Sequence, residues 1–218
     1  MRALGYVAKF LISVGVGILL FVAWTLWGTG LYTERQQRVL AQELDALPPL
    51  PPRAAAGRSA GPPPSFDPAP GAPVFRIAIE RIGVDVVVVE GVGAEQLRMG
   101  PGHYPACDAD FSPPLCTEYE VVWPGEPGRV IVSGHRTTYG APFWDLDELA
   151  PGDRIEVDTR WGDFTYEVRR SEVVPANSRA IVVPSDEPEL VLTTCNPRFS
   201  ASERLIVFAR LTEARPQR

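Results

Sequence analysis

The hydrophobic positions of this chain change their spacing along its length, and each spacing predicts a different kind of structure. Residues 10–27 read FLISVGVGILLFVAWTLW, an uncharged run with the length of a membrane-spanning helix. Residues 33–47 have apolar side chains near helical spacing, which predicts a second helix. From residue 74 onwards, short apolar runs alternate with turn residues, which indicates a domain built mainly of strands.

The charges that flank the first apolar run predict how it is oriented. Arg2 and Lys9 precede the run, so that its N-terminal side is expected in the cytoplasm and everything after Leu31 outside. A cleaved signal peptide is the alternative interpretation. It is disfavoured because the run is long and because bulky Trp24 and Trp27 stand where small residues precede a cleavage site. We therefore expect residues 1–31 to form a cytoplasmic N-terminus and a single-pass membrane anchor.

The segment that follows is rich in proline and has few side chains to bury. Residues 48–73 contain ten prolines and several small residues. Such a composition predicts an extended, semi-rigid linker, which at ~3.1 Å per residue could reach about 80 Å. Residues 32–73 are thus expected to be a juxtamembrane helix and a linker that holds the rest of the chain away from the membrane.

Residues 74–218 are expected to form an all-β domain. About eight short strands with little helix argue for a closed or nearly closed β-barrel. Short helical segments are predicted at 94–100 and 143–149, and the GPGHYP run at 100–105 is predicted to be a turn in which His103 is structural. The predicted strands lie at 75–80, 84–90, 129–134, 154–159, 163–174, 189–195 and 204–211.

The charge balance excludes one class of partner. Residues 74–218 hold 23 acidic against 15 basic side chains, and Lys9 is the single lysine of the chain. An acidic domain has no general attraction for nucleic acid or for anionic lipid, so we expect neither as a partner.

Three cysteines form an odd set in a domain expected outside the membrane. Cys107 and Cys116 flank a short loop, and a disulfide between them would stabilise the fold by roughly 2.5–3 kcal/mol in the chain-entropy model. The pairing leaves Cys195 as a free thiol. A metal site made of His103, Cys107 and Cys116 is the alternative, although no fourth ligand is evident and the spacing fits no zinc pattern.

Cys195, His135 and Arg204 together supply the groups needed for cysteine acyl transfer. Cys195 ends one predicted strand, His135 follows another, and Arg204 opens the last one. The three would provide a thiolate that attacks, an imidazole that protonates the leaving amine and a cation that stabilises the oxyanion. Taken singly, each has an ordinary structural explanation: a buried thiol, a loop histidine and a solvated strand end. Arg198 is a competitor for the oxyanion role, but a strand residue holds its geometry better than a loop residue.

The motifs around these residues resemble the sortase family, and within it class E from actinobacteria. The resemblance rests on VLTTC at 191–195, the Arg204 that follows nine residues later, VSGHRTTYGAPF at 132–143 and GPGHYP at 100–105, and it covers roughly residues 74–211. It implies an eight-stranded sortase-type barrel with short helices, with Cys195, His135 and Arg204 as catalytic residues and with no metal or other cofactor. It also suggests Tyr139 and Thr194 as residues that contact substrate.

The resemblance implies a reaction and its partners. A membrane-anchored sortase would cleave a C-terminal LAXTG- or LPXTG-like sorting signal of surface proteins between Thr and Gly, hold the acyl group as a thioester, and pass it to an amine of a peptidoglycan precursor. A pilus-polymerising sortase and a non-catalytic, membrane-tethered β-barrel binding module are the alternatives.

Two features of the chain depart from the family pattern. Val191 stands where the family has the first Thr of TLXTC, which we expect to tune the wall of the groove. The stretch from Cys107 to Cys116 is an insertion that we expect to shape the groove rim or to dock a partner.

Overall fold

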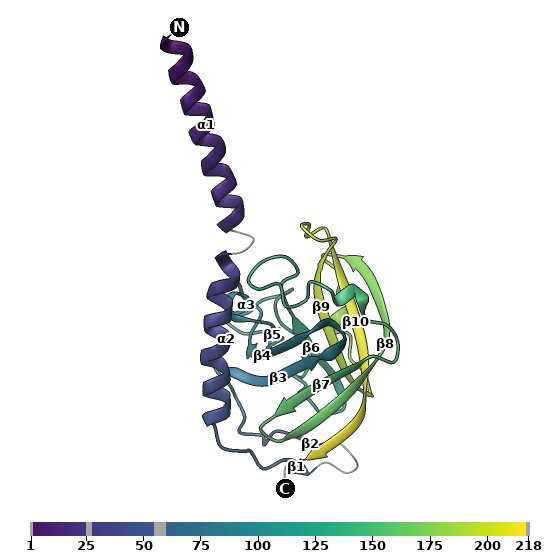
Figure 1. Cartoon of the computed structure of the whole chain (residues 1–218). Coiled ribbons are helices and arrows are strands. Elements are labelled where there is room, and N and C mark those ends of the chain that lie inside the picture. The colour runs from purple at the N-terminus through teal and green to yellow at the C-terminus, as the bar shows by residue number, and fades with distance from the viewer. Residues whose placement is uncertain (1, 25–27, 55–59, 217–218) are drawn as a thin grey trace.

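A closed barrel of eight strands forms the centre of the protein (Figure 1). The structure is a computed structural model that describes residues 2–24, 28–54 and 60–216. Around the barrel the strands follow the order β10-β8-β7-β3-β4-β5-β6-β9. The predicted eight-stranded barrel is therefore confirmed. Its strands are β3 (Pro73–Ile79), β4 (Val84–Glu90), β5 (Gly102–His103), β6 (Gly128–Ser133), β7 (Arg154–Thr159), β8 (Gly162–Pro175), β9 (Pro188–Asn196) and β10 (Glu203–Pro216).

The barrel interior is filled by side chains that alternate along the strands. In β7, Ile155 and Val157 point inward and the residues that alternate with them are exposed, as a half-buried strand requires. Strands β9 and β10 are apolar on both faces. Their inward side chains, such as Leu192, join the main core, whereas Val191 and Ile206 join a second buried cluster on the opposite face. That second cluster lies outside the barrel wall.

Two long helices precede the barrel, α1 (Arg2–Ala23) and α2 (Thr29–Ala46). Residues 5–23 of α1 have a mean hydropathy of 2.2 and none is buried, so this helix is long and apolar enough to cross a membrane. Figure 1 shows α1 extending beyond the barrel, whereas α2 runs along the barrel side. Leu40 and Leu44 of α2 pack against Val87 and Val89 of β4.

The expectation of an extended linker after α2 is wrong for the residues that the structure describes. The Leu50 backbone nitrogen donates to the Arg160 carbonyl oxygen (2.7 Å), and Leu50 and Phe66 pack against the main core. The Phe66 ring meets the Trp123 ring edge-on at 4.9 Å. A short pair, β1 (Arg53–Ala54) with β2 (Ala60–Gly61), lies in this segment. Its few apolar side chains find partners on the barrel, which composition alone does not reveal.

Three smaller differences concern element boundaries. The GPGHYP run, predicted to be a turn, contains β5, the one barrel strand whose position was not predicted. It is only two residues long and pairs with β4 and β6. The predicted helix at 143–149 shrinks to a 3-10 turn at Leu146–Glu148, while the one at 94–100 is α3 (Ala94–Met99). Strand β10 continues to Pro216, because it pairs with the whole of β8.

Candidate active site

Three neighbouring strands bring His135, Cys195 and Arg204 into one row. Strands β6 and β9 are parallel with Ser133 opposite Thr193, so that His135 and Cys195 each follow two residues beyond the same rung. Strands β9 and β10 are antiparallel, with Arg204 directly opposite Cys195. Paired residues of adjacent strands project from the same face with Cβ atoms about 5 Å apart. Cys195 therefore lies on β9, between the strand that leads to His135 and the strand that carries Arg204.

Two hydrogen bonds tie the strand of the cysteine to that of the histidine. The Gly134 backbone nitrogen donates to the Thr193 carbonyl oxygen (3.1 Å), and the Thr194 hydroxyl donates to the Gly134 carbonyl oxygen (2.7 Å). Gly134 itself leaves room for a ring, since a Cβ there would lie 2.6 Å from Phe143. The approach of Cys195 and His135 is thus set by backbone pairing and not by their own side chains.

The three residues line one cavity of about 410 Å³ on the outer face of the barrel. The second buried cluster forms its floor, with Val191 beneath and Ile206 at the surface of the cavity. One wall is the loop at 113–116 and the other is the segment at 176–182 that joins β8 to β9. A groove of this kind, apolar with a few convergent polar groups, suits an extended peptide.

Burial changes the acid–base properties of the histidine. It lowers the pKa of His135 below its ordinary value of 6.5, because the surrounding protein disfavours the imidazolium form. The Tyr139 ring lies against the imidazole, with centroids 5.0 Å apart. At neutral pH the free protein therefore holds His135 mainly as neutral imidazole.

Of the two candidate cations, Arg204 lines the cavity and Arg198 does not. The Arg204 guanidinium donates to the carbonyl oxygens of Ala201 (3.1 Å) and Glu203 (2.9 Å). It also acts electrostatically on buried Tyr104, whose pKa rises to about 12 through desolvation, an effect that the arginine offsets in part. Arg198 instead donates to the carboxylates of Asp145 and Asp147, each at 3.0 Å.

Comparison with known proteins identifies the family. The sortase domain family matches residues 77–212 of the chain. The chain belongs to the sortase family. Members of this family are cysteine transpeptidases, which agrees with the thiol, imidazole and guanidinium that line the cavity.

Class E sortases are among the relatives of this sortase. It is 30% identical to sortase SrtE1 of Streptomyces coelicolor over 99% of its own length, but it spans only 58% of that relative. It is 31% identical to sortase D of Bacillus subtilis, with 67% of each chain covered. The crystal structure of sortase E1 from Streptomyces coelicolor superimposes with a TM-score of 0.56 at 29% identity, over 69% of this sortase and 94% of that chain.

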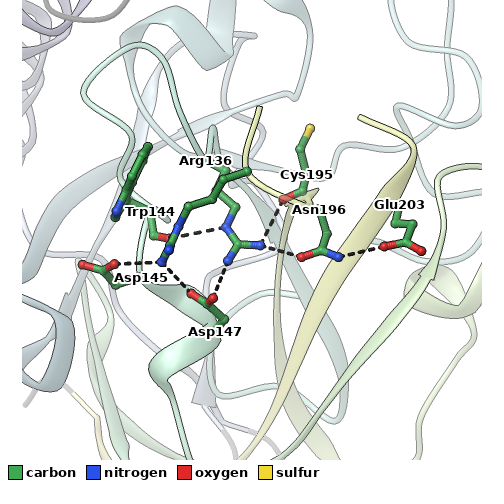
Figure 2. A network of polar contacts seen from close by, with 8 residues as sticks. Arg136, Trp144, Asp145, Asp147, Cys195, Asn196 and Glu203 are labelled. Atoms are coloured by element: carbon green, nitrogen blue, oxygen red, sulfur yellow. Dashed lines mark hydrogen bonds and ion pairs between the residues drawn. The ribbon is translucent and has the colours of Figure 1, made fainter. Parts of the chain in front are cut away.

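Sequence reasoning missed one residue of the site, Arg136, whose side chain is only 3% exposed. Its guanidinium pairs with Asp147 (2.8 Å) and donates to the Asn196 side-chain oxygen (2.7 Å) and to the Cys195 carbonyl oxygen (3.4 Å). Asn196 in turn donates to Glu203 (2.8 Å) at the start of β10. Figure 2 shows this chain of contacts, with the Cys195 sulfur pointing away from it. The signal in the sequence that could have identified Arg136 was its position directly after His135.

The predicted disulfide of this sortase is present and closes the loop that forms one cavity wall. Cys107 and Cys116 are bonded with their Cα atoms 4.9 Å apart, while Cys195 remains a free thiol. The bond leaves no thiolate for the alternative metal site. His103 is held between the Glu90 carboxylate (2.8 Å) and the Val122 carbonyl oxygen (3.1 Å), which agrees with a structural role.

Neither Tyr139 nor Thr194, the two predicted substrate contacts, has a side-chain hydroxyl that is both at the cavity and free of a hydrogen bond within the protein. Tyr139 lies against His135 and is not part of the cavity lining, and the Thr194 hydroxyl is already bonded to Gly134. Thr193 offers what Thr194 does not. Its hydroxyl is buried without a hydrogen-bond partner in the described structure, and the residue lines the cavity. Successive side chains of a strand point to opposite faces of the sheet, so Thr193 and Thr194 lie in different environments.

Proposed function

We propose that this sortase is a membrane-anchored transpeptidase that cleaves a C-terminal LAXTG- or LPXTG-like sorting signal between Thr and Gly. The observation that carries the proposal is the row of His135, Cys195 and Arg204 along one peptide-sized cavity. In this proposal residues 1–31 are the cytoplasmic N-terminus and anchor, residues 32–73 connect, and residues 74–218 form the extracytoplasmic catalytic domain. The crystal structure of sortase E1 from Streptomyces coelicolor holds a tripeptide in its active site, which supports a peptide as the ligand.

The first half of the reaction forms a thioester. The Cys195 thiolate attacks the carbonyl carbon of the signal Thr, and the negative charge that develops on the carbonyl oxygen is stabilised by the Arg204 guanidinium. The imidazolium form of His135 arises when the neutral imidazole takes the proton of the Cys195 thiol, and it gives that proton to the nitrogen of the scissile bond as that bond breaks. The Gly-terminated fragment leaves as an amine, and the surface protein stays attached through a Thr–Cys195 thioester.

The second half transfers the acyl group to another amine. Neutral His135 takes a proton from the incoming amine, which attacks the thioester carbonyl and releases the Cys195 thiolate. No lysine follows Lys9 in the chain, so the domain after the anchor has no side-chain amine of its own to offer. We propose an amine of a peptidoglycan precursor as the acceptor.

The unpartnered Thr193 hydroxyl gives the substrate a further point of attachment. A backbone N–H or carbonyl of an extended peptide in the cavity would satisfy it, and a buried polar group left unpaired costs about 1–3 kcal/mol. This supports a peptide main chain running beside Thr193, which lies two residues before Cys195 on the same face of β9.

Cleavage of a fluorogenic LAXTG peptide by the full chain in detergent tests the proposal. We expect cleavage by the natural chain, a mass increase of Cys195 by the acyl fragment when acceptor is withheld, and no cleavage by Cys195→Ala. Arg204→Lys is expected to lower kcat by roughly 100-fold, the cost of one lost oxyanion donor. Equal cleavage by the Cys195→Ala variant would exclude the thiol as nucleophile.

A further inference from the structure

The loop that contains His135 and Tyr139, hereafter the histidine loop, is held close to the end of the apolar helix α1. The Tyr139 backbone nitrogen, four residues past His135, donates to the Thr29 hydroxyl at the start of α2 (3.1 Å). Only five residues lie between Ala23, where α1 ends, and Thr29, so Thr29 is six residue steps from the end of α1. Six residues span at most about 22 Å even when fully extended. If α1 crosses a membrane, the histidine loop cannot be far from that membrane's surface.

Apolar side chains from three separate segments gather at the same end of the barrel. They are Leu31 of α2, Trp144 after the histidine loop and Phe199 in the turn between β9 and β10, hereafter the rim patch. Phe199 is 70% exposed, Leu31 62% and Trp144 37%. All three border a hollow of about 430 Å³, and the Phe199 and Trp144 rings meet edge-on at 5.7 Å. Figure 1 shows the β9–β10 turn at the end of the barrel from which α1 extends.

Exposed aromatic side chains beside a membrane helix are typical of the interface between lipid and water. The neighbouring charges do not suggest attraction to anionic lipid. Arg198 covers the Trp144 ring at 4.9 Å, but its charge is balanced by Asp145 and Asp147. Glu34 also borders the hollow. Insertion of apolar side chains into a zwitterionic surface is therefore the fitting interaction.

We propose that the rim patch docks onto the outer surface of the bilayer that α1 spans. The turn that carries Phe199 begins just after Cys195, so docking holds the nucleophile and its cavity at the lipid surface. A membrane-anchored substrate would then reach the thiol without leaving the bilayer. This proposal rests on the membrane anchoring in the proposed function and adds a second, reversible contact between the catalytic domain and the lipid.

A fluorescent label at position 199 tests the contact directly. The full-length Cys195→Ala chain, in which Cys107 and Cys116 remain bonded, is given Phe199→Cys and labelled with NBD in single-copy phosphatidylcholine nanodiscs. The matched control is Arg215→Cys. Arg215 is exposed near the far end of β10, about 40 Å along the strand from its first residue, Glu203. We expect the label at 199, and not at 215, to emit at shorter wavelength and to be quenched by doxyl-labelled lipid.

The other outcomes contradict the proposal. Equal emission at both positions, while Trp24 directly after α1 is quenched, would show that the helix inserts but the rim patch does not dock. Failure of Trp24 to be quenched would remove the anchor and the docking together. A shift at 199 that depends on the number of chains per disc, without lipid quenching, would mean that a second copy covers the patch. The label experiment uses no active thiol, so it is independent of whether the proposed reaction occurs.

Activity provides a second measurement. Phe199→Ser in the otherwise natural chain is expected to lower the rate on a lipid-anchored signal by about 10-fold, the population change expected from losing one buried aromatic side chain at the interface. The rate on a soluble signal peptide in detergent should not change. Val39→Ser is the control, because Val39 is exposed on α2 about 15 Å further along the helix than Thr29. An equal loss on both substrates would contradict docking.

Discussion

Arg136, the buried arginine next to His135, links two segments of the candidate active site. Arg136 connects the loop after His135 with the last residues of β9, through Asn196 and the Cys195 carbonyl oxygen. A nearly buried guanidinium needs such partners, because an unpaired buried charge is strongly destabilising. The side chain touches no reacting atom, so Arg136 positions the site and is not a catalytic residue.

Replacing Arg136 by Lys should therefore weaken both the fold and the site. Lys cannot reach Asp147, Asn196 and the Cys195 carbonyl oxygen at once, and we expect the free energy of unfolding to fall by about 2 kcal/mol or more. Urea unfolding measures the loss, and kcat should fall with KM little changed. Arg198→Lys, in which the partners are exposed, is the control with an expected loss below about 1 kcal/mol. If both variants lost the same free energy of unfolding, the contacts of Arg136 would contribute no more to stability than those of the exposed Arg198.

The lowered pKa of His135 predicts a pH dependence of stability. Because the folded protein binds the imidazole proton less well than the unfolded chain, this contribution is fully present above pH 6.5 and is lost as the pH falls through the lower pKa of the folded state. Urea unfolding from about pH 8 to about pH 5 should show this decline. His135→Gln should have a shallower decline over the same range. A variant with an unchanged slope would mean that the decline has another source.

At the scale of elements, the cavity is bounded by two segments that are held in place in different ways, one by flanking strands and the other by a disulfide. The segment at 176–182 is anchored at both ends by strands, whereas the wall at 113–116 belongs to a loop closed by the Cys107–Cys116 disulfide. Arg179 of the first segment forms an ion pair with Glu118, just past the second. The disulfide thus stabilises a wall of the cavity from outside the strands β6, β9 and β10.

Removing the disulfide should affect substrate binding more than chemistry. Cys107→Ser together with Cys116→Ser is expected to lower the free energy of unfolding by about 2.5–3 kcal/mol. KM for the signal peptide should rise while kcat stays near its natural value. A reductant such as tris(2-carboxyethyl)phosphine should raise KM of the natural chain and leave the double variant unaffected. If KM does not change in either case, the loop plays no part in binding.

At the scale of the whole molecule, α2, the helix that follows the apolar helix α1, packs as part of the barrel domain. Strand β4 lacks a strand partner for Val87 on one side, and the Gln37 side chain of α2 takes that place, accepting from the Val87 nitrogen (2.7 Å) and donating to its carbonyl oxygen (3.0 Å). Leu40 and Leu44 add apolar contact with the same strand. Helix α2 follows α1 in the sequence and contacts both β4 and the histidine loop in space.

Truncating the packed face of α2 should destabilise the barrel. Leu40→Ala is expected to lower the free energy of unfolding by about 2–5 kcal/mol, the usual cost of shortening a buried leucine. Val39→Ala, one residue earlier and exposed, should change it by less than about 0.5 kcal/mol. Thermal unfolding of the full chain in detergent compares the two. Equal small effects would mean that α2 does not contribute to the stability of the folded domain.

Several features followed from local sequence because local chemistry determines them. The apolar run predicted α1, the alternation of side chains predicted seven of the eight barrel strands, and the short spacing of Cys107 and Cys116 predicted their bond. Cys195, His135 and Arg204 could be singled out because each lies at a strand end next to a recognisable motif. Such signals depend on neighbours within a few residues.

What remained was decided by partners far away in the chain. The strand β5 exists because β4 and β6 flank it, and the proline-rich segment packs because Trp123 and Arg160 offer it contacts. The role of Arg136, the different environments of Thr193 and Thr194, and the approach of α2 to the histidine loop likewise depend on strand pairing and on burial. A sequence specifies these contacts only through the completed fold, since the residues that satisfy a buried group are chosen by distance in space and not by distance along the chain.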